Sequence, residues 1–339
     1  MTLHVNLGKD SYDIEIESGI LKKAGQHCDL NRKVLVVSDL GVPKAYWQTV
    51  MKQSREAVPV ILDPGEKSKS LESFTKIQRE LLVHDFSRND CVVAVGGGVV
   101  GDLAGFAAAC YMRGIDFYNI PTTVLSQVDS SIGGKTAVNF EGVKNVVGAF
   151  YQPKKVLIDP DVLKTLPDRQ RSNGLAEAVK MAVTLDEILF QKFEQCKNPE
   201  ECLALIPDAI RIKQRVVQQD EKEKGLRKVL NFGHTIGHGI EATCEGSLYH
   251  GECVALGMLP MCSEEVRTRL RSIYEKMHLP LSCKVDVEKA VSAIEHDKKT
   301  TGTGVTTVYV PKIGSFEFRE ETVESLGEKV RQIGEEGSR

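Results

Sequence analysis

The stretch Cys91-Val-Val-Ala-Val-Gly96-Gly-Gly98-Val-Val-Gly101-Asp102 decides the fold that the sequence predicts. A short apolar run leads directly into glycines, and a second apolar run, residues 103–109, has the character of a helix. A strand, Gly-x-Gly-x-x-Gly and a helix in this order are typical of a dinucleotide-binding turn. Glycines let the backbone approach a pyrophosphate, and the helix N-terminus supplies amide donors. A tight turn that binds nothing is the alternative explanation of the same glycines.

Working outward, strand and helix patterns alternate on both sides of this turn. Residues 3–7 and 12–17 alternate between apolar and polar, which predicts an antiparallel pair of strands. Helical patterns cover residues 42–55 and 70–83. Short apolar runs typical of buried parallel strands occur at 33–39, 58–62, 116–120 and 155–159. This alternation predicts an α/β domain with a largely parallel sheet.

The pattern changes near residue 165, beyond which almost every segment has helical periodicity. The expected helices cover 172–195, 199–219, 233–243, 250–276 and 286–296, and residues 305–310 alternate like one strand of a hairpin. The sequence therefore predicts an α/β Rossmann-like domain over residues 1–165, followed by an all-helical domain over residues 166–339.

Composition restricts the class of protein. The chain has 339 residues, of which 41% are hydrophobic and 27% charged, and its net charge is −3. These values are ordinary for a globular protein and argue against a nucleic-acid or anionic-membrane partner, because either needs a basic surface. No apolar run reaches the roughly 18–20 residues of a membrane span. Nine scattered cysteines without a Cys-x-x-Cys pair favour reduced thiols and a cytoplasmic location.

The loops after the predicted strands contain further nucleotide-binding candidates. The acidic residue expected about twenty residues after Gly-x-Gly-x-x-Gly is missing, and Asp39, at the end of an earlier strand, is the better candidate for the ribose. Pro64-Gly-Glu66-Lys-Ser-Lys69 and Pro121-Thr122-Thr123 also follow strands, where ligands collect in open α/β sheets. Gly133-Gly-Lys135-Thr is not a P-loop, since Asp129 occupies the position of the required first glycine.

Histidines indicate a metal site in the second domain. Asn231-Phe-Gly-His234-Thr-Ile-Gly-His238 places two imidazoles one helical turn apart, and His250-Gly-Glu252 follows. The pattern is not His-Glu-x-x-His, so the general base of a metalloprotease is absent. Glu177, inside an apolar helix face, completes a site with two of the three histidines. Packed or capping histidines, and a surface pair between Glu177 and Lys180, are the alternatives.

Basic residues recur beside glycines and amides in a chain that is slightly acidic overall. Such settings favour a pocket for an anionic substrate that carries phosphate or carboxylate groups. These residues are Arg113, Lys135, Lys144, Lys180, Lys213, Arg227, Lys298 and Lys299, with Asn145 beside Lys144.

Taken together, these segments resemble the 3-dehydroquinate synthases of the sugar-phosphate cyclase superfamily. The resemblance extends over roughly residues 30–320, with the segments in the same order and spacing. The matching runs begin at Gly96 (GGGVVGDLAGF), Tyr111 (YMRG), Ile120 (IPTTVLSQVDSSIGGKTAVN), Lys144 (KNVVGAFYQP), Leu163 (LKTLP), Gly174 (GLAEAVK), Leu230 (LNFGHTIGH) and His250 (HGE).

The resemblance implies an NAD-binding Rossmann-like domain, a helical domain, a homodimer, catalytic NAD and one zinc or cobalt ion. It assigns the metal to Glu177, His234 and His250, and makes His238 a substrate-side residue. It assigns NAD to Asp39, Glu66, Lys69, Gly97, Gly98, Asp102, Thr122, Thr123, Asp129, Lys144 and Thr165. It assigns the substrate to Arg113, Lys135, Asn145, Lys180, Lys213, Arg227, Asn231, His238 and Lys299.

The implied reaction converts 3-deoxy-D-arabino-heptulosonate 7-phosphate to 3-dehydroquinate and phosphate, the second step of the shikimate pathway. It combines transient oxidation by NAD, β-elimination of phosphate, reduction, ring opening and aldol closure. Sister cyclases that act on substrates without a carboxylate tend to alter the set Arg227, Asn231, His238 and Lys299, which this chain retains. Aminodehydroquinate synthase, other cyclases, a metal-dependent polyol dehydrogenase of the same fold, and a catalytically silent nucleotide-binding regulator are the competing hypotheses.

Overall fold

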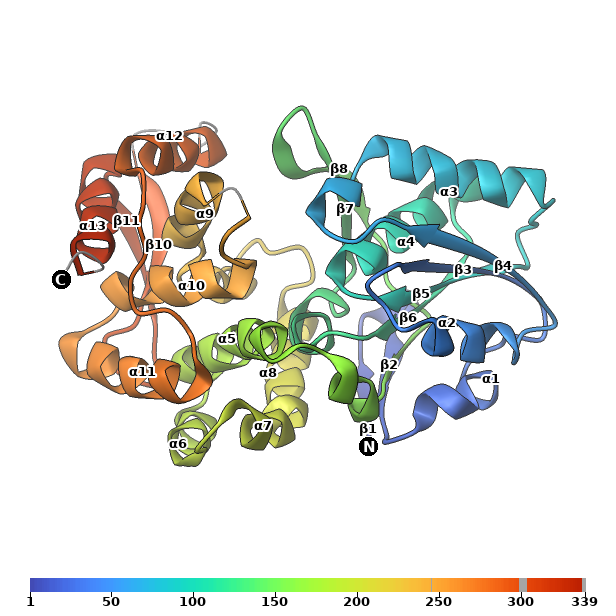
Figure 1. The fold of residues 1–339 in the computed structure, drawn as a ribbon, viewed down its shortest axis with the longest axis horizontal. Helices are drawn as coiled ribbons and strands as arrows, with labels where there is room; N and C mark the ends of the chain where they lie inside the picture. Colours follow the sequence, from blue (N-terminus) through green and yellow to red (C-terminus); the bar gives the residue numbers. More distant parts are fainter. Residues whose placement is uncertain (245, 299–303, 337–339) are drawn as a thin grey trace. The chain divides into compact units, whose positions relative to one another are not determined.

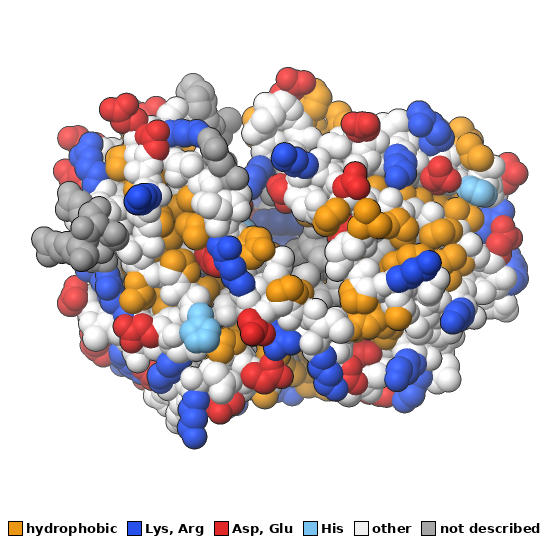
Figure 2. Space-filling view, viewed as in Figure 1, with side chains coloured by type: hydrophobic (Ala, Val, Ile, Leu, Met, Phe, Trp, Pro, Cys, Tyr) orange, Lys and Arg blue, Asp and Glu red, His pale blue; other side chains and the backbone are white. Residues whose placement is uncertain are grey.

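The computed structural model describes residues 1–244, 246–298 and 304–336, without the side chains of 296–298, 335 and 336 (Figure 1). The chain divides into two compact units, Met1–Leu166 and Pro167–Arg339. The boundary predicted from the sequence lies between residues 165 and 166. Acidic and basic side chains intermingle on the face shown in Figure 2. The whole chain carries nearly equal numbers of both, with a net charge of −3. None of the described helices has the length and apolar character needed to cross a membrane.

The first unit is built on a seven-stranded sheet. Its order is β1-β2-β9-β6-β5-β3-β4, antiparallel between β1 and β2 and parallel elsewhere, which confirms the predicted α/β class. The strands are β1 (Thr2–Val5), β2 (Tyr12–Ile16), β3 (Lys33–Asp39), β4 (Glu56–Leu62), β5 (Cys91–Gly96), β6 (Asp116–Pro121) and β9 (Lys155–Ile158). The helices are α1 (Ala24–His27), α2 (Lys44–Met51), α3 (Leu71–Val83) and α4 (Gly98–Cys110).

The core of this unit follows from its sequence pattern. Every residue of β5 is buried, as its unbroken apolar run predicts. Leu35 and Val92, from neighbouring strands, pack against α3 and α4 in one hydrophobic cluster. Figure 1 shows α3 and α4 over one face of the sheet and α2 on the other.

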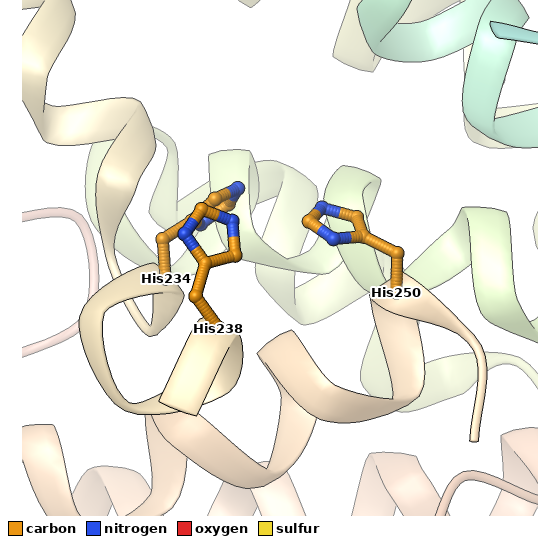
Figure 3. Close-up of side chains that lie close together, drawn as sticks. All are labelled: His234, His238 and His250. Carbon is orange, nitrogen blue, oxygen red and sulfur yellow. The ribbon is translucent and has the colours of Figure 1, made fainter. Parts of the chain in front are cut away.

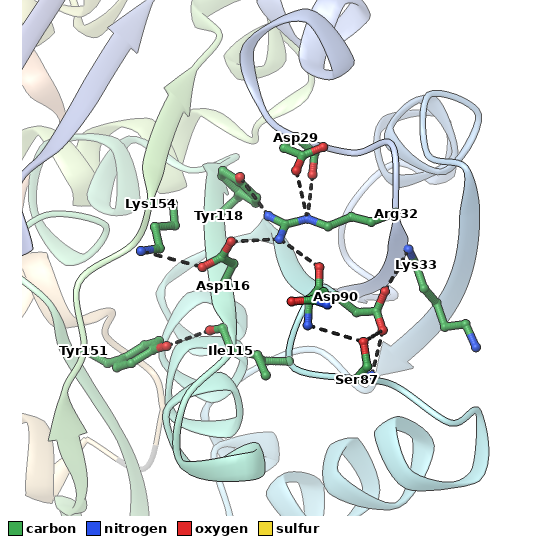
Figure 4. A network of polar contacts seen from close by, with 11 residues as sticks. Asp29, Arg32, Lys33, Ser87, Asp90, Ile115, Asp116, Tyr118, Tyr151 and Lys154 are labelled. Carbon is green, nitrogen blue, oxygen red and sulfur yellow. Dashed lines mark hydrogen bonds and ion pairs between the residues drawn. The ribbon is translucent and has the colours of Figure 1, made fainter.

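A polar network holds the amino ends of the parallel strands (Figure 4). The Arg32 guanidinium, before β3, donates to Asp116 Oδ2 at 2.8 Å and to the Tyr118 hydroxyl at 2.9 Å, both on β6. Asp90, before β5, accepts from the Lys33 amide at 3.2 Å. These bonds connect β3, β5 and β6 at their amino ends, which is the end of the sheet opposite the glycine turn. Ligands of open α/β sheets bind at the loops that follow the carboxyl ends of the strands.

A β-hairpin that the sequence analysis did not predict crosses the same unit. β7 (Lys135–Phe140) pairs antiparallel with β8 (Val143–Phe150) through the two-residue turn Glu141-Gly142. Both turn residues have positive φ, 50° and 80°, as in the turns that favour hairpins. β7 lies against α4 at Gly105, where a Cβ would be 2.5 Å from Thr136 Cγ2, so only glycine permits this contact.

The second unit is helical, as predicted, with one small sheet. Its helices are α5 (Asp168–Leu185), α6 (Glu187–Gln195), α7 (Pro199–Cys202), α8 (Ile206–Gln219), α9 (His234–Thr243), α10 (His250–Met258), α11 (Glu264–Met277), α12 (Val287–Lys298) and α13 (Val323–Glu336). β10 (Val305–Tyr309), indicated by the sequence, pairs with β11 (Glu317–Glu321), which was not predicted.

Three predictions of a single continuous helix are wrong, because each of these segments contains two α-helices. The segment 172–195 breaks at Asp186, whose carboxylate accepts from the Leu189 amide at 2.9 Å and so caps α6. The segment 199–219 breaks before α8, which has Pro207 in its first turn. The segment 250–276 breaks before α11, which Ser263 caps. In each case a capping residue or a proline ends one helix and starts another inside an uninterrupted apolar pattern.

Candidate active site

Glycines bring three helices of the second unit into direct backbone contact. A Cβ on Gly257 of α10 would lie 2.1 Å from the Gly233 carbonyl oxygen, just before α9. A Cβ on Gly251 would lie 2.0 Å from the Asn173 carbonyl oxygen of α5. Because these positions carry only hydrogen, α5, α9 and α10 approach more closely than larger side chains allow. The candidate metal ligands lie on these three helices.

The three predicted ligands converge. Glu177 Oε1 lies 3.7 Å from His234 Nε2 and 3.7 Å from His250 Nε2. Glu177 is 0% exposed, and this oxygen has no hydrogen-bond partner among the residues that the structure describes. Burial of an unpaired carboxylate oxygen is costly, so the arrangement indicates a missing partner of positive charge.

His238 lies beside the same space. Figure 3 shows His234 and His238 projecting from α9 and His250 from the start of α10, with the three rings around one opening. Their ring centroids are 5.3, 5.3 and 5.7 Å apart, and one nitrogen of each ring lies within 4.8 Å of the others. His238 is exposed, whereas Glu177 is fully buried.

The charges around Glu177 favour a divalent cation. Its other oxygen, Oε2, accepts from the buried Lys180 ammonium. Burial, with the Lys180 charge and the neighbouring imidazoles, holds the pKa of His234 well below its usual value, so this ring is neutral and has a lone pair. Burial alone would lower the pKa of His250, but hydrogen bonding to Glu241 and the charge of Glu177 raise it.

The geometry fits a metal ion bound by one carboxylate and two imidazoles. Zinc bonds to such ligands are about 2.0–2.2 Å long, so ligand atoms around a tetrahedral ion lie roughly 3.4 Å apart. The observed 3.7 Å separations between Glu177 Oε1 and each imidazole nitrogen are close to this value. Glu177, His234 and His250 therefore have the chemistry and spacing to hold zinc or a chemically similar cation.

The predicted substrate-binding residues of this unit lie on elements linked to the histidines. Lys180 is on α5 beside Glu177, and Lys213 is on α8, which packs against α5. Arg227 and Asn231 belong to the 3-10 segment Leu226–Asn231 that leads into His234. Lys180, Lys213 and Arg227 are at most 5% exposed. Lys299 lies outside the described residues.

In the first unit, several predicted NAD-binding residues meet at the hairpin. The buried Lys69 ammonium lies 2.5 Å from Asp102 Oδ2 on α4 and also donates to Asn145 on β8. Glu66 accepts from the side chain of Asn139 at 2.8 Å. Burial raises the pKa of Asp102 to about 6, against the lowering effect of Lys69. Glu66, Lys69, Asp102 and Asn145 thus form one polar cluster through Asn139.

The glycine turn lies next to the loop that follows β6. Gly97 caps α4, and a Cβ there would lie 3.2 Å from Thr123 Cγ2, while the Thr122 amide donates to the Gly96 carbonyl at 2.9 Å. Gly98 begins α4, and Asp129 lies in the π-helical turn Ser126–Ser130.

The remaining predicted residues of the first unit lie elsewhere on it. Asp39 lines a cavity of about 300 Å³ with Trp47, and burial raises its pKa. The Thr165 hydroxyl is hydrogen-bonded to Tyr46 at 2.9 Å. The others, Arg113, Lys135 and Lys144, are exposed.

Three residues of the site were missed by the sequence analysis: Asn139, Asn173 and Glu241. Asn139 could have been found only through the hairpin turn that follows it. Glu241 had a signal, because it lies seven residues after His234 and therefore on the same face of α9. Asn173 had none, since its contact with Gly251 joins residues 78 apart.

Comparison with known proteins gives a consistent result over most of the chain. Residues 59–173 match the family model of the 3-dehydroquinate synthase N-terminal domain, and residues 174–300 match that of the C-terminal domain. The chain is 42% identical over 336 residues to the 3-dehydroquinate synthase of Enterococcus faecalis (strain ATCC 47077 / OG1RF), covering 93% of this chain and 94% of that one.

Two solved structures share the fold closely. A 2-deoxy-scyllo-inosose synthase complexed with carbaglucose-6-phosphate, NAD+ and Co2+ superposes with a TM-score of 0.89 at 26% identity, covering 98% of this chain and 100% of that one. The 2-epi-5-epi-valiolone synthase of Streptomyces hygroscopicus subsp. jinggangensis 5008, with NAD+ and Zn2+ bound, gives a TM-score of 0.88 at 26% identity, covering 98% and 99%.

Proposed function

The chain belongs to the 3-dehydroquinate synthase family and has the activity of that enzyme, and on this premise we propose how its residues divide the work. Glu177, His234 and His250 hold one zinc or cobalt ion. Residues around the glycine turn of the first unit hold NAD. The substrate is 3-deoxy-D-arabino-heptulosonate 7-phosphate, bound by the residues that the family resemblance assigns to it.

The observation that carries the metal assignment is the orphaned Glu177 oxygen. It lies 3.7 Å from two imidazole nitrogens and has no hydrogen-bond donor among the described residues. A cation among these three atoms would satisfy the carboxylate and both lone pairs at once. The family resemblance makes His238, which is exposed, a substrate-side residue, and an imidazole is suited to orient a hydroxyl or relay its proton.

The buried cations support an anionic substrate. Lys180, Lys213 and Arg227 are almost completely buried in one unit of a slightly acidic chain. Lys180 also pairs with Glu177. Lysine and arginine are the side chains suited to phosphate and carboxylate groups, and the substrate carries one of each. The Arg227 Nη1 atom already donates to the Glu221 carbonyl at 2.5 Å, which fixes the direction of the guanidinium.

The nucleotide-binding assignment depends on the first unit alone. Gly97 and Gly98 open α4 without side chains, so backbone amides at the helix N-terminus are accessible to a pyrophosphate. Asp39 lines a separate cavity at the end of β3, where the carboxyl ends of parallel strands place a ribose or a base. The other proposed contacts are Glu66, Lys69, Asp102, Thr122, Thr123, Asp129, Lys144 and Thr165.

Bound by these residues, a divalent ion would supply Lewis-acid polarisation of a substrate hydroxyl, and NAD would supply reversible hydride transfer. The protein's own residues orient the substrate. Lys135, Lys180 and Lys213 bind its anionic groups, with Arg113, Asn145, Asn231 and Lys299 as further contacts. No protein residue is assigned as the base for phosphate elimination, since the phosphate itself is able to take that proton. A homodimer remains a prediction of the family resemblance.

The test is turnover of the heptulosonate phosphate with sub-stoichiometric NAD and zinc, coupled to a dehydroquinase. We expect phosphate release and dehydroquinate formation in excess of NAD, which a polyol dehydrogenase would not give. His250→Ala should abolish turnover and lower zinc content while the far-UV circular dichroism stays unchanged. His84→Ala, which changes a half-exposed histidine of the first unit, is the control. Full activity and zinc content in His250→Ala would overturn the ligand assignment.

A further inference from the structure

Glu241 faces the side of His250 that the proposed metal does not use. His250 Nδ1 lies 3.3 Å from Glu241 Oε2, while Nε2 of the same ring lies 3.7 Å from Glu177 Oε1. An ionised carboxylate only accepts hydrogen bonds, so Nδ1 must carry the hydrogen. In a neutral ring, Nε2 then has the lone pair and is directed toward Glu177.

His234 has a corresponding arrangement. Its Nδ1 lies 3.3 Å from the Phe232 carbonyl oxygen, which also only accepts, and its Nε2 lies 3.7 Å from Glu177 Oε1. In both rings, therefore, Nε2 faces Glu177 Oε1, while Nδ1 on the opposite side of the ring faces a hydrogen-bond acceptor. The two acceptors differ in kind. The acceptor for His234 is the Phe232 backbone carbonyl, which no substitution removes, whereas the acceptor for His250 is the Glu241 side chain, which a substitution can remove.

The backbone that carries His250 is held independently of Glu241. The Gly251 amide donates to Asn173 Oδ1 at 2.6 Å. Glu252 caps the helix by accepting from the Tyr249 amide at 2.8 Å and is itself bound by Arg169 at 2.7 Å. These contacts fix the first turn of α10 but leave the imidazole free to rotate about its side-chain bonds. Glu241 contacts the ring at Nδ1, the nitrogen on the side away from Glu177.

We propose that Glu241 is a positioning residue that fixes the tautomer and orientation of His250 so that Nε2 faces the metal. This inference rests on the proposed function, since it takes His250 to be a metal ligand. Carboxylates that bind the outer nitrogen of a ligating histidine raise its basicity and restrict its rotation, and their loss typically weakens metal binding by about 10- to 100-fold.

The experiment measures zinc affinity by competition with a chromophoric chelator, together with the visible spectrum of the cobalt-loaded protein. Glu241→Ala should weaken zinc binding about 10- to 100-fold and alter the cobalt spectrum. Glu241→Gln retains an oxygen acceptor of the same reach and should recover most of the affinity. Urea unfolding of the metal-free proteins shows whether either variant is misfolded.

Glu194→Ala is the matched control. Glu194 is also a partly exposed carboxylate of the second unit, and it binds Arg269 through two contacts of 2.7 Å. Its loss should change stability but leave zinc affinity unchanged. Wild-type zinc affinity and an unchanged cobalt spectrum in Glu241→Ala would overturn the inference. His250→Ala separates the two proposals: if it also binds zinc normally, the metal site itself is wrong.

Discussion

The close packing of α10 against the start of α9 can be tested by adding one methyl group at Gly257. An alanine Cβ would lie 2.1 Å from the Gly233 carbonyl oxygen, where ordinary contacts begin at 3.4 Å. Relief of this clash requires the two backbones to separate by about 1.3 Å. The obstacle is backbone rather than the end of a flexible side chain, so rotation of a side chain cannot remove it.

The magnitude follows from two opposing effects. Alanine is favoured over glycine inside a helix by about 1 kcal/mol. Overpacking of a tight core costs about 1–3 kcal/mol, and a backbone obstacle places Gly257→Ala at the upper end. The expected net loss in the free energy of unfolding is therefore about 2 kcal/mol. Metal–ligand distances in well-formed sites stay within about 0.2 Å of their usual values, so a shift of about 1.3 Å between the helices of His234 and His250 should also weaken zinc binding.

The assay is urea unfolding of the metal-free protein followed by far-UV circular dichroism, with zinc affinity measured separately. Gly25→Ala is the control, because it makes the same change in a helix of the first unit, where the nearest atoms lie 3.3 Å from the new Cβ. Gly25→Ala should leave zinc affinity unchanged. If Gly257→Ala were instead stabilised by the helix-propensity gain of about 1 kcal/mol, the close approach of the two helices would be refuted.

Two further substitutions test the electrostatics of the two units. Burial raises the pKa of Asp102 from 3.8 to about 6, so the folded state binds this proton more tightly than the unfolded state. The stability of the wild type relative to Asp102→Asn should therefore fall as pH rises through this window, and a constant difference in urea midpoints would contradict the assignment. Lys180→Met should lose turnover but bind zinc at least as tightly as the wild type, because the buried ammonium repels a cation and occupies one oxygen of Glu177. Weaker zinc binding in a folded Lys180→Met would show that the ammonium supports the metal site.

The sheet of the first unit was predictable because its signals are local. The run from Cys91 to Gly96 is apolar without interruption, as a strand covered on both faces requires, and the glycines that follow permit a tight turn into the next helix. The β7–β8 hairpin was missed because β8 is largely exposed and its apolar residues, 146–150, do not alternate with polar ones. Its signal was the two-residue turn Glu141-Gly142, which is weaker than Asn-Gly.

The helix breaks show a different limit. An apolar stripe continues through Asp186 and through Ser263, since both flanking helices bury the same kind of face. The periodicity of apolar residues shows which residues are buried. Residues on both sides of a helix break are buried, so the periodicity does not reveal the break. The capping chemistry of the aspartate and serine distinguishes two helices from one, but such residues are also common on helix surfaces. Pro260, just before Ser263, is a further signal of the second break.

The resemblance, not the spacing of residues, selected Glu177, His234 and His250 from four candidates, and the proposed ligand set leaves out His238. His234 and His238 are one turn apart on α9, the spacing most often associated with a shared metal, yet His238 is exposed while Glu177, from a helix more than fifty residues earlier, is buried opposite His234. The pairing depends on Gly233, Gly251 and Gly257, whose missing side chains set the distance between the helices. A glycine in a helical pattern indicates flexibility or close approach equally well, and only the position of the facing backbone distinguishes the two. The site is therefore encoded as much by absent side chains as by the ligands themselves, and for this reason Gly257→Ala should disturb zinc binding without altering any ligand.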